Sequence, residues 1–301
     1  MKKVLFFTED EWAFGSVHHA LNKVLYKEGI YSNLLNWRVQ YTYKEFELLN
    51  NVYDVFVTTP EIVYILRDYG VPLNKIIAIA HGQRDILLGK LDNKFDFYSE
   101  LKGFGVISEV LKSKCAEWNI SVVPDVVELG IHFDLFHSTL SKKLSIIGHG
   151  NPKREIFNQS GIETKRSKLI PVIINGIEGV ELKKHEQFKF FCMPAFYREI
   201  DCLIMPSIEE AGGLPVMEAA AAGRLVMGTP VGYFEHNAKK GGGILLPLEE
   251  NDFIQSAKRN IIFYRDNPKE YQRKCLEIQE FARYNYDWSY KIGDWVTLLN
   301  K

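Results

Sequence analysis

The chain has 301 residues, of which 46% are hydrophobic and 25% charged, and its formal net charge is −1. This length accommodates two domains, and the composition is typical of a soluble globular protein. A net charge so close to zero provides no overall positive field for nucleic acid or an anionic membrane. The apolar run at the start is too short for a signal peptide, and no run reaches the length of a transmembrane helix.

The four cysteines, Cys115, Cys192, Cys202 and Cys275, are scattered without the spacing of metal ligands. Scattered cysteines in apolar or helical contexts indicate reduced thiols, as in a cytoplasmic protein. The sequence also has no Asp-x-Asp pair at a strand end and no His/Cys cluster. We therefore expect no metal site and no cofactor.

Predicted strands alternate with predicted helices along the first half, a pattern typical of doubly wound parallel sheets. The expected strands are residues 3–8, 32–37, 54–59, 76–80, 105–107 and 122–128. Ser16 is expected to cap a helix that ends at Gly29, Pro60 to open a helix, and Ser108 to cap a helix that reaches Trp118.

The second half repeats this alternation. The expected strands are residues 144–147, 171–175, 201–205, 225–227 and 244–247, with residues 164–169 on a helix and 194–199 as a helical turn. Residues 252–288 are predicted as helices interrupted at 266–268, and residues 289–299 form an amphipathic segment. No internal repeat is present beyond the shared α/β pattern.

Residues 203–236, LIMPSIEEAGGLPVMEAAAAGRLVMGTPVGYFEH, carry the most informative pattern. A buried strand that ends at Pro206 and Ser207 precedes Glu210, a glycine pair and a helix predicted to start near Leu214. Glu218 is expected on the first turn of that helix. A helix N-terminus has unpaired N–H groups that favour an anion, and carboxylates accept hydrogen bonds from hydroxyls. The segment therefore indicates a ligand that carries both hydroxyl groups and a phosphate.

The same segment resembles the donor-binding signature of retaining glycosyltransferases with the GT-B fold, especially glycosyltransferase family 4. The matching positions are Pro206-Ser207, Glu210, Gly212-Gly213, Glu218-Ala219, Gly223, Val226, Val231-Gly232 and Glu235. The chain departs from the family pattern at Ala-Gly-Gly in the loop, usually Gly-Phe-Gly, and at Arg224-Leu225, usually a residue followed by Pro. The resemblance implies that Glu218 holds the ribose hydroxyls and Glu210 the sugar hydroxyls. It also implies that backbone N–H groups of Gly213 and Leu214 line the sugar–phosphate side.

Basic residues follow the predicted strand that ends in SIIGHG. Positioned Lys and Arg side chains stabilise a diphosphate leaving group without a metal ion. The family places an Arg and a Lys in this region, and KRSKL at 165–169 resembles the Lys end of that pattern. We expect Lys165 and Arg166 to balance the diphosphate. Further donor-binding candidates are Gly148 and Gly150 in the preceding turn, and Lys153 and Arg154 as rival phosphate ligands.

His81 directly follows the predicted strand IIAIA. Ligands of open α/β sheets bind beyond the carboxyl ends of the strands. The family has a His at this strand end, facing the cleft and contacting the donor sugar, so His81 is a candidate catalytic residue. An alternative is that His81 is the general base of an inverting enzyme. We expect His18 and His19, inside the first predicted helix, to serve packing.

The first loop, EDEWAFGS at residues 9–16, corresponds to the family's glycine-rich loop near the donor phosphates and the acceptor. Only Gly15 and Ser16 resemble that loop. An aromatic ring beside carboxylates suits a sugar ring, since Trp packs on its apolar faces and the acids accept from its hydroxyls. We therefore assign Trp12, Gly15 and Ser16 to the acceptor side.

ELGIHFDLF at residues 128–136 resembles the turn that leaves the family's first domain; Gly130 and Phe136 match, Leu129 replaces Asn, and the Asp is displaced to Asp134. The resemblance implies an α/β GT-B fold, two Rossmann-like doubly wound domains that face each other across a cleft. The expected boundaries are 1–136 for the acceptor-side domain, 137–143 for a linker, 144–285 for the donor domain and 286–301 for a helix that crosses back.

These features predict a retaining, metal-independent glycosyltransferase that moves a sugar from a UDP- or GDP-sugar to an acceptor hydroxyl. The acceptor is a glycan, a small molecule or another hydroxyl compound, with a protein or a modified nucleic-acid base also open. One alternative is a nucleotide-sugar 2-epimerase of the same fold, which needs acids placed for elimination. The other is a non-catalytic protein that binds a nucleotide-sugar.

Overall fold

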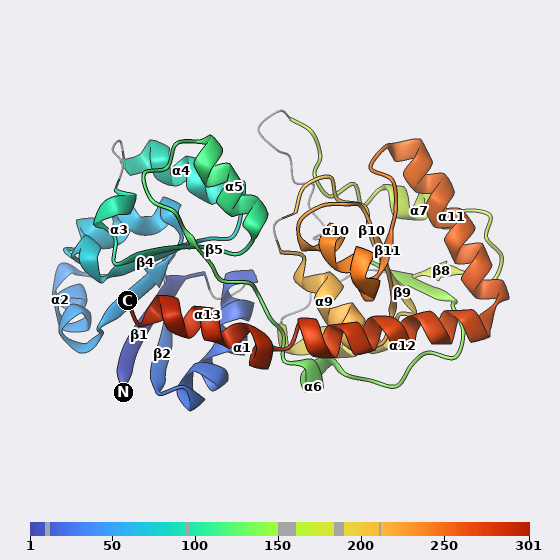
Figure 1. The fold of residues 1–301 in the computed structure, drawn as a ribbon, viewed down its shortest axis with the longest axis horizontal. Helices are drawn as coiled ribbons and strands as arrows, with labels where there is room; N and C mark the ends of the chain where they lie inside the picture. Colours follow the sequence, from blue (N-terminus) through green and yellow to red (C-terminus); the bar gives the residue numbers. More distant parts are fainter. Residues whose placement is uncertain (10–12, 94–96, 150–160, 184–189, 211) are drawn as a thin grey trace. The chain divides into compact units, whose positions relative to one another are not determined.

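The computed structural model describes residues 1–9, 13–93, 97–149, 161–183, 190–210 and 212–301, and these divide into two compact units (Figure 1). The first unit comprises Met1–Gly130 together with Trp288–Lys301, and the second comprises Ile131–Asp287. Each unit is built on a parallel β-sheet with helices in the crossovers. The predicted class, α/β with two doubly wound Rossmann-like units, is confirmed.

Six parallel strands form the sheet of the first unit, in the order β2-β1-β3-β4-β5-β6. They are β1 (Lys2–Thr8), β2 (Ile30–Asn36), β3 (Val55–Thr58), β4 (Ile76–Ala80), β5 (Gly103–Val106) and β6 (Asp125–Val126). All residues of β3 and β4 are buried, as expected for strands covered on both faces. Strand order reverses between β1 and β3, so the loops after these strands lie at the switch point where such sheets bind ligands.

The helices of the first unit are α1 (Ala13–Lys27), α2 (Tyr43–Val52), α3 (Val63–Asp68), α4 (Gln83–Asn93), α5 (Glu109–Glu117) and α13 (Trp288–Leu299). Ser108 caps α5 as predicted, because its Oγ accepts a hydrogen bond from the backbone N–H of Leu111 at 3.2 Å. The predicted cap at Ser16 is wrong. Since α1 begins at Ala13, Ser16 lies inside the helix.

The C-terminal helix α13 belongs to the core of the first unit. Trp295 donates through Nε1 to the carbonyl of Glu128 at 2.9 Å. Leu298 is fully buried beside Gly103 and Gly105, where an added Cβ would lie 2.9 and 2.7 Å from its methyl groups. Glycine in β5 therefore makes room for a side chain that arrives from the other end of the chain.

Five parallel strands form the second sheet, in the order β11-β10-β9-β7-β8. They are β7 (Ile146–Gly148), β8 (Glu181–Leu182), β9 (Cys202–Met205), β10 (Leu225–Gly228) and β11 (Ile244–Leu245). The helices of this unit are α6 (Phe133–Phe136), α7 (Leu169–Ile174), α8 (Met193–Arg198), α9 (Leu214–Ala221), α10 (Tyr233–Asn237), α11 (Glu250–Asp266) and α12 (Pro268–Asn285). The switch point of this sheet lies between β7 and β9.

Two predicted elements of the second unit are wrong. The strand expected at 171–175 is the body of α7, and the helix expected at 164–169 is irregular chain that ends where α7 starts. The buried residues of α7 are Leu169, Ile170 and Ile173, which share one helical face. Pro171 is tolerated because the first turn of a helix needs no N–H donor. Apolar β-branched residues in so short a run do not separate strand from helix.

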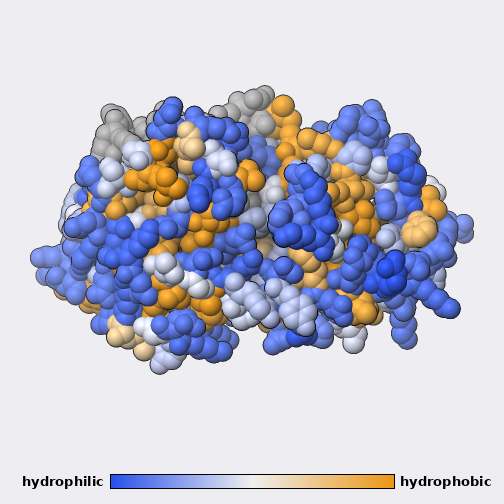
Figure 2. All heavy atoms as spheres, in the orientation of Figure 1, coloured by the Kyte–Doolittle hydropathy of each residue, from blue (hydrophilic) through white to orange (hydrophobic). Residues whose placement is uncertain are grey.

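Hydrophilic side chains predominate over α11 and α12 on the face shown in Figure 2. Both helices bury one apolar side, which includes Phe253 and Ile261 on α11 and Tyr271 and Ile278 on α12. This is the amphipathic pattern of helices that cover a sheet. Within the described part of the chain, no helix combines the length and apolar character needed to cross a membrane.

Candidate active site at the carboxyl ends of the strands

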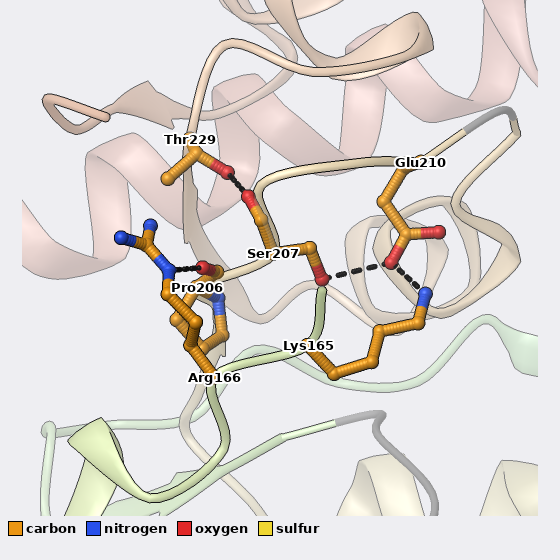
Figure 3. Close-up of polar contacts among 6 residues, drawn as sticks. All are labelled: Lys165, Arg166, Pro206, Ser207, Glu210 and Thr229. Carbon is orange, nitrogen blue, oxygen red and sulfur yellow. Dashed lines mark hydrogen bonds and ion pairs between the residues drawn. The ribbon is translucent and has the colours of Figure 1, made fainter. Parts of the chain in front are cut away.

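Glu210 and Lys165 form an ion pair in the second unit, beyond the carboxyl end of β9 (Figure 3). Their side chains are 14% and 19% exposed, so solvent screens the pair only partly. Ser207 donates through Oγ to Oε1 of Glu210 at 2.8 Å, and Lys165 contacts the same oxygen. Among the described residues, Oε2 is therefore the Glu210 oxygen available to a ligand.

The chain around this pair is fixed by backbone contacts. The backbone N–H of Ile208 donates to the carbonyl of Thr164 at 2.8 Å, which holds the segment that carries Lys165 against the loop after β9. The buried hydroxyl of Thr229, just after β10, donates to the carbonyl of Ser207. Three separate segments thus determine where Glu210 and Lys165 meet.

Arg166 points away from Lys165 (Figure 3). Its guanidinium donates through Nε to the carbonyl of Pro206 at 2.7 Å and through Nη1 to that of Leu248 at 3.0 Å. The guanidinium carbon also lies 5.5 Å from the ring centre of Phe253. Burial lowers the pKa of this side chain from its usual value. The two cations that are adjacent in sequence therefore have different surroundings, and the contacts of Arg166 are those of a structural residue.

Helix α9 begins at Leu214, as predicted, behind Gly213. Gly213 has φ of 69°, in the left-handed region that suits glycine, and Pro215 occupies the first turn. Glu210, Gly212 and Gly213 line a narrow pocket together with Val231 from the loop after β10 and Tyr233 from the start of α10. The N-terminus of α9 and the Glu210 carboxylate consequently border the same surface.

Glu218 is the fifth residue of α9, so it lies at the start of the second turn and not on the first turn as expected. Its side chain is buried, and Tyr197 on α8 donates through Oη to Oε2 at 2.8 Å. Burial raises the pKa of Glu218 to about 8, while the hydrogen bond from Tyr197 lowers it. The hydrogen bond from Tyr197 fixes the position of this buried carboxyl.

The remaining described donor-side residue is Gly148, the last residue of β7. An added Cβ there would lie 2.7 Å from Cγ2 of Ile200, so the close packing of the strand explains this glycine. Gly150, Lys153 and Arg154 lie outside the described residues.

His81 follows β4 directly, at a small cavity that it lines with Thr8 and Thr59 from the ends of β1 and β3. Burial lowers the pKa of its imidazole to about 3, so the ring is neutral near pH 7. The backbone N–H groups of His81 and Gly82 donate to Oδ2 of Asp85 at 2.7 and 2.9 Å. These bonds fix the chain that presents His81.

Two residues assigned to the acceptor side, Gly15 and Ser16, lie in α1, the first buried and the second partly buried. Trp12 lies outside the described residues. Nearby, Glu9 forms a 3.1 Å ion pair with Arg38 from the loop after β2. His18 is buried against Phe6, which confirms its packing role, whereas His19 is exposed and the packing prediction for it is wrong.

Sequence reasoning missed two residues of this site. Tyr197 has no motif to mark it, because its contact with Glu218 joins two helices separated by β9. Asp85 was detectable, since an acid three residues after Gly82 fits the acidic half of a capping box, here at the start of α4. Among the described residues, no three His, Cys, Asp or Glu side chains come together in a group able to hold a metal ion.

Two Rossmann-like units, with an acid–base pair at the switch point of the second, define a protein of the GT-B class. Residues 104–262, more than half of the chain, match the family described as glycosyl transferases group 1. The chain belongs to this family, and it is a glycosyltransferase by that membership. No curated protein sequence matches the chain.

Solved structures confirm the fold over the whole chain. Sucrose-phosphate synthase from Thermosynechococcus elongatus has a TM-score of 0.71 at 11% identity, with 100% of this chain and 98% of that chain covered. HepE from Anabaena, solved with UDP and glucose, has a TM-score of 0.67 at 11% identity, with 100% of both chains covered. The catalytic domain of starch synthase IV from Arabidopsis thaliana, bound to ADP and acarbose, has a TM-score of 0.66 at 12% identity, covering 100% and 99%.

Proposed function

We propose that the second unit binds a UDP- or GDP-sugar and that the protein transfers the sugar to an acceptor hydroxyl with retention of anomeric configuration. The observation that carries this proposal is the Lys165–Glu210 pair beside the N-terminus of α9. A cation, a carboxylate and helix N–H groups on one surface match the diphosphate and the sugar hydroxyls of such a donor. The structural neighbour HepE was solved with UDP and glucose, which supports a nucleoside diphosphate as ligand of this fold.

We assign the donor contacts of the site as follows. Oε1 of Glu218 accepts from the ribose hydroxyls, with Tyr197 holding the other oxygen. Oε2 of Glu210 accepts from hydroxyls of the donor sugar, and Lys165 neutralises the diphosphate. The backbone N–H groups of Gly213 and Leu214 face the sugar–phosphate side. Lys153 and Arg154 remain rival phosphate ligands, and Arg166 receives no donor contact in this proposal.

The reaction breaks the bond between the anomeric carbon and the phosphate oxygen, and the electron pair leaves with the diphosphate. Lys165 stabilises that negative charge. The acceptor hydroxyl forms the new bond from the same face, and its proton passes to the departing phosphate oxygen. No metal ion takes part in this scheme. The imidazole of His81 is neutral near pH 7 and takes no proton from the acceptor hydroxyl in this scheme.

Binding of the donor is tested by thermal unfolding with UDP, GDP, ADP and the corresponding nucleosides. A ligand at a hundred times its Kd stabilises the folded state by about 2.7 kcal/mol. Lys165→Ala should weaken the binding of the nucleoside diphosphates and leave the binding of the nucleosides unchanged. Only the diphosphates carry the negative charge that Lys165 contacts. Lys168→Ala, an exposed lysine in the same segment, is the matched control. An equal loss of affinity for nucleoside and nucleoside diphosphate would contradict the role of Lys165.

Transfer itself is tested with the donor that stabilises the protein. The reaction is run in EDTA, and the first-formed product is analysed by proton NMR. We expect activity to survive chelation and the anomeric coupling of the donor to be retained. An inverted coupling, together with a severe loss in His81→Ala, would assign His81 as an inverting base. Formation of an epimer of the donor sugar without transfer would favour the 2-epimerase, and binding without any turnover would favour a non-catalytic binding protein.

We also propose that the reaction takes place in the cytoplasm. In support, all four cysteines are free thiols in the structure, and three of them, Cys115, Cys202 and Cys275, are buried. Free cysteines are typical of a reducing compartment.

A further inference from the structure

An open groove with aromatic walls lies in the first unit, between the start of α2 and helix α3. Its volume is about 360 Å³, and its lining includes Gln40, Tyr41, Tyr43, Tyr64, Asp68 and Tyr69. It shares no lining residue with the cavity beside His81. Pockets of this size hold small molecules or single units of larger ones.

The tyrosine rings are held in place without a ligand. Tyr69 stacks on the buried ring of Phe46, with centroids 4.3 Å apart and planes within 4°. Its hydroxyl accepts from the backbone N–H of Tyr41 at 3.4 Å, and Tyr41 in turn donates to the carbonyl of Asn36 at 2.9 Å. Tyr43 packs edge-on against Tyr69 at 5.7 Å. Because these contacts already order the rings, binding of a ligand costs little side-chain entropy.

The groove combines apolar ring faces with hydrogen-bonding groups. Tyr43 is 70% exposed, and Asp68 and Gln40 line the same groove. Arg67 pairs with Oδ1 of Asp68 at 3.2 Å. A pyranose ring has an apolar C–H face that packs on an aromatic ring, and hydroxyls that donate to carboxylate and amide oxygens. A proline-rich peptide also packs on tyrosines, but it offers carbonyl acceptors, which a carboxylate cannot satisfy. Asp68 therefore favours a saccharide.

The groove continues from the ligand-binding edge of the first sheet. Tyr41 bonds to Asn36, the last residue of β2. Arg38, in the same loop, pairs with Glu9 directly after β1, at the switch point of this sheet. Loop 37–42 thus connects the ends of β1 and β2 to the groove wall.

From this placement we propose that the tyrosine groove, defined by the residues above, binds a sugar unit of a glycan other than the sugar that reacts. The occupant is an oligosaccharide, and the groove extends the acceptor side of the protein. The identification of the glycan as acceptor or product rests on the proposed glycosyl transfer, whereas saccharide binding rests on the groove alone.

The test is saturation-transfer difference NMR of the full chain with maltohexaose, cellohexaose and chitohexaose at millimolar concentration. We expect at least one to bind. Tyr43→Ala should weaken that binding about three- to tenfold, the range for loss of one aromatic contact. Asp68→Asn should weaken it as well. Tyr26→Ala, an exposed tyrosine of α1 in the same unit, is the matched control and should bind like the unaltered protein.

Stabilisation by UDP or GDP is measured on the same variants and should be unchanged in Tyr43→Ala, which also shows that the variant is folded. Absence of binding by all three saccharides overturns the inference, as does binding that Tyr43→Ala and Asp68→Asn leave intact. A proline-rich peptide that binds in a Tyr43-dependent manner in place of the saccharides also overturns it. Saccharide binding without any nucleotide effect would leave the inference standing and contradict the donor site instead.

Discussion

At the scale of single residues, the two glutamates of the signature differ in their surroundings. Glu210 is paired with a cation and borders the surface, whereas Glu218 is buried and receives a hydrogen bond from a tyrosine. Desolvation raises the pKa of the Glu218 carboxyl to about 8. Glu218 is therefore a residue that links stability to pH.

We expect Glu218→Gln to change the pH dependence of unfolding. The folded-state pKa is raised above the unfolded value of 4.5, so the folded state binds more protons over this window and loses stability as the pH rises from 4.5 to about 8. The neutral glutamine keeps an acceptor for Tyr197 and removes this loss, a relative gain of up to roughly 4 kcal/mol at high pH. Urea unfolding at about pH 5 and about pH 9 measures it. If variant and parent differed in free energy of unfolding by the same amount at both pH values, the burial argument would be contradicted.

Arg166→Ala is expected to lower stability without a specific effect on turnover. It removes charge-assisted hydrogen bonds to Pro206 and Leu248, each worth roughly 1.5–3 kcal/mol. Urea unfolding gives the loss, and kcat normalised to folded protein gives the activity. Lys165→Ala should show the opposite pattern, little change in stability and a large loss of turnover. If Arg166→Ala retained full stability and lost activity, the guanidinium would be a phosphate ligand after all.

At the scale of elements, the donor site depends on how α9 begins. Gly213 adopts φ of 69° immediately before the helix, and it lines the same pocket as Glu210. The sequence pattern Gly-Gly-Leu-Pro is sufficient to predict this start, because glycine before and proline inside the first turn are both local signals.

Gly213→Ala should therefore destabilise the protein by about 1 kcal/mol, since a side chain is strained in the left-handed region. Gly293→Ala, inside α13, is the contrasting variant. Its added Cβ meets nothing within 4 Å, and alanine favours a helix, so a gain of about 0.5–1 kcal/mol is expected. Thermal unfolding of both variants measures these changes in stability. A loss of stability in Gly293→Ala would show that α13 does not tolerate a side chain at this position.

At the scale of the whole molecule, the chain returns to its first unit through α13. The last residues complete the core formed by the first 130, since Trp288, Trp295 and Leu298 are buried there. The first unit is thus a single fold made from both ends of the chain.

Leu298→Ala should destabilise the first unit by about 2–5 kcal/mol, the cost of a large-to-small change in a core. Hydrogen exchange should increase in β4 and β5 and stay unchanged in β9 and β10. Leu276→Ala, on an exposed position of α12, is the control, with a change within about 0.5 kcal/mol. Faster exchange in β9 and β10 would mean that α13 also stabilises the second unit.

Features that depend on neighbouring residues could be predicted from the amino-acid sequence. Apolar runs predicted β1, β4, β9 and β10, local signals located the starts of α5 and α9, and the spaced signature predicted the fold class. Periodicity, caps and glycine positions act over a few residues, so they can be read before the chain folds.

Features that depend on distant residues became visible in the folded protein. The run at 169–174 became a helix because one face of it is buried in the second core. Arg166 turned toward the carbonyl of Leu248, Glu218 acquired Tyr197 as partner, and the tyrosines of two helices formed one groove. In each case, packing between segments far apart in sequence set the direction of the side chain, and no local pattern encodes that direction.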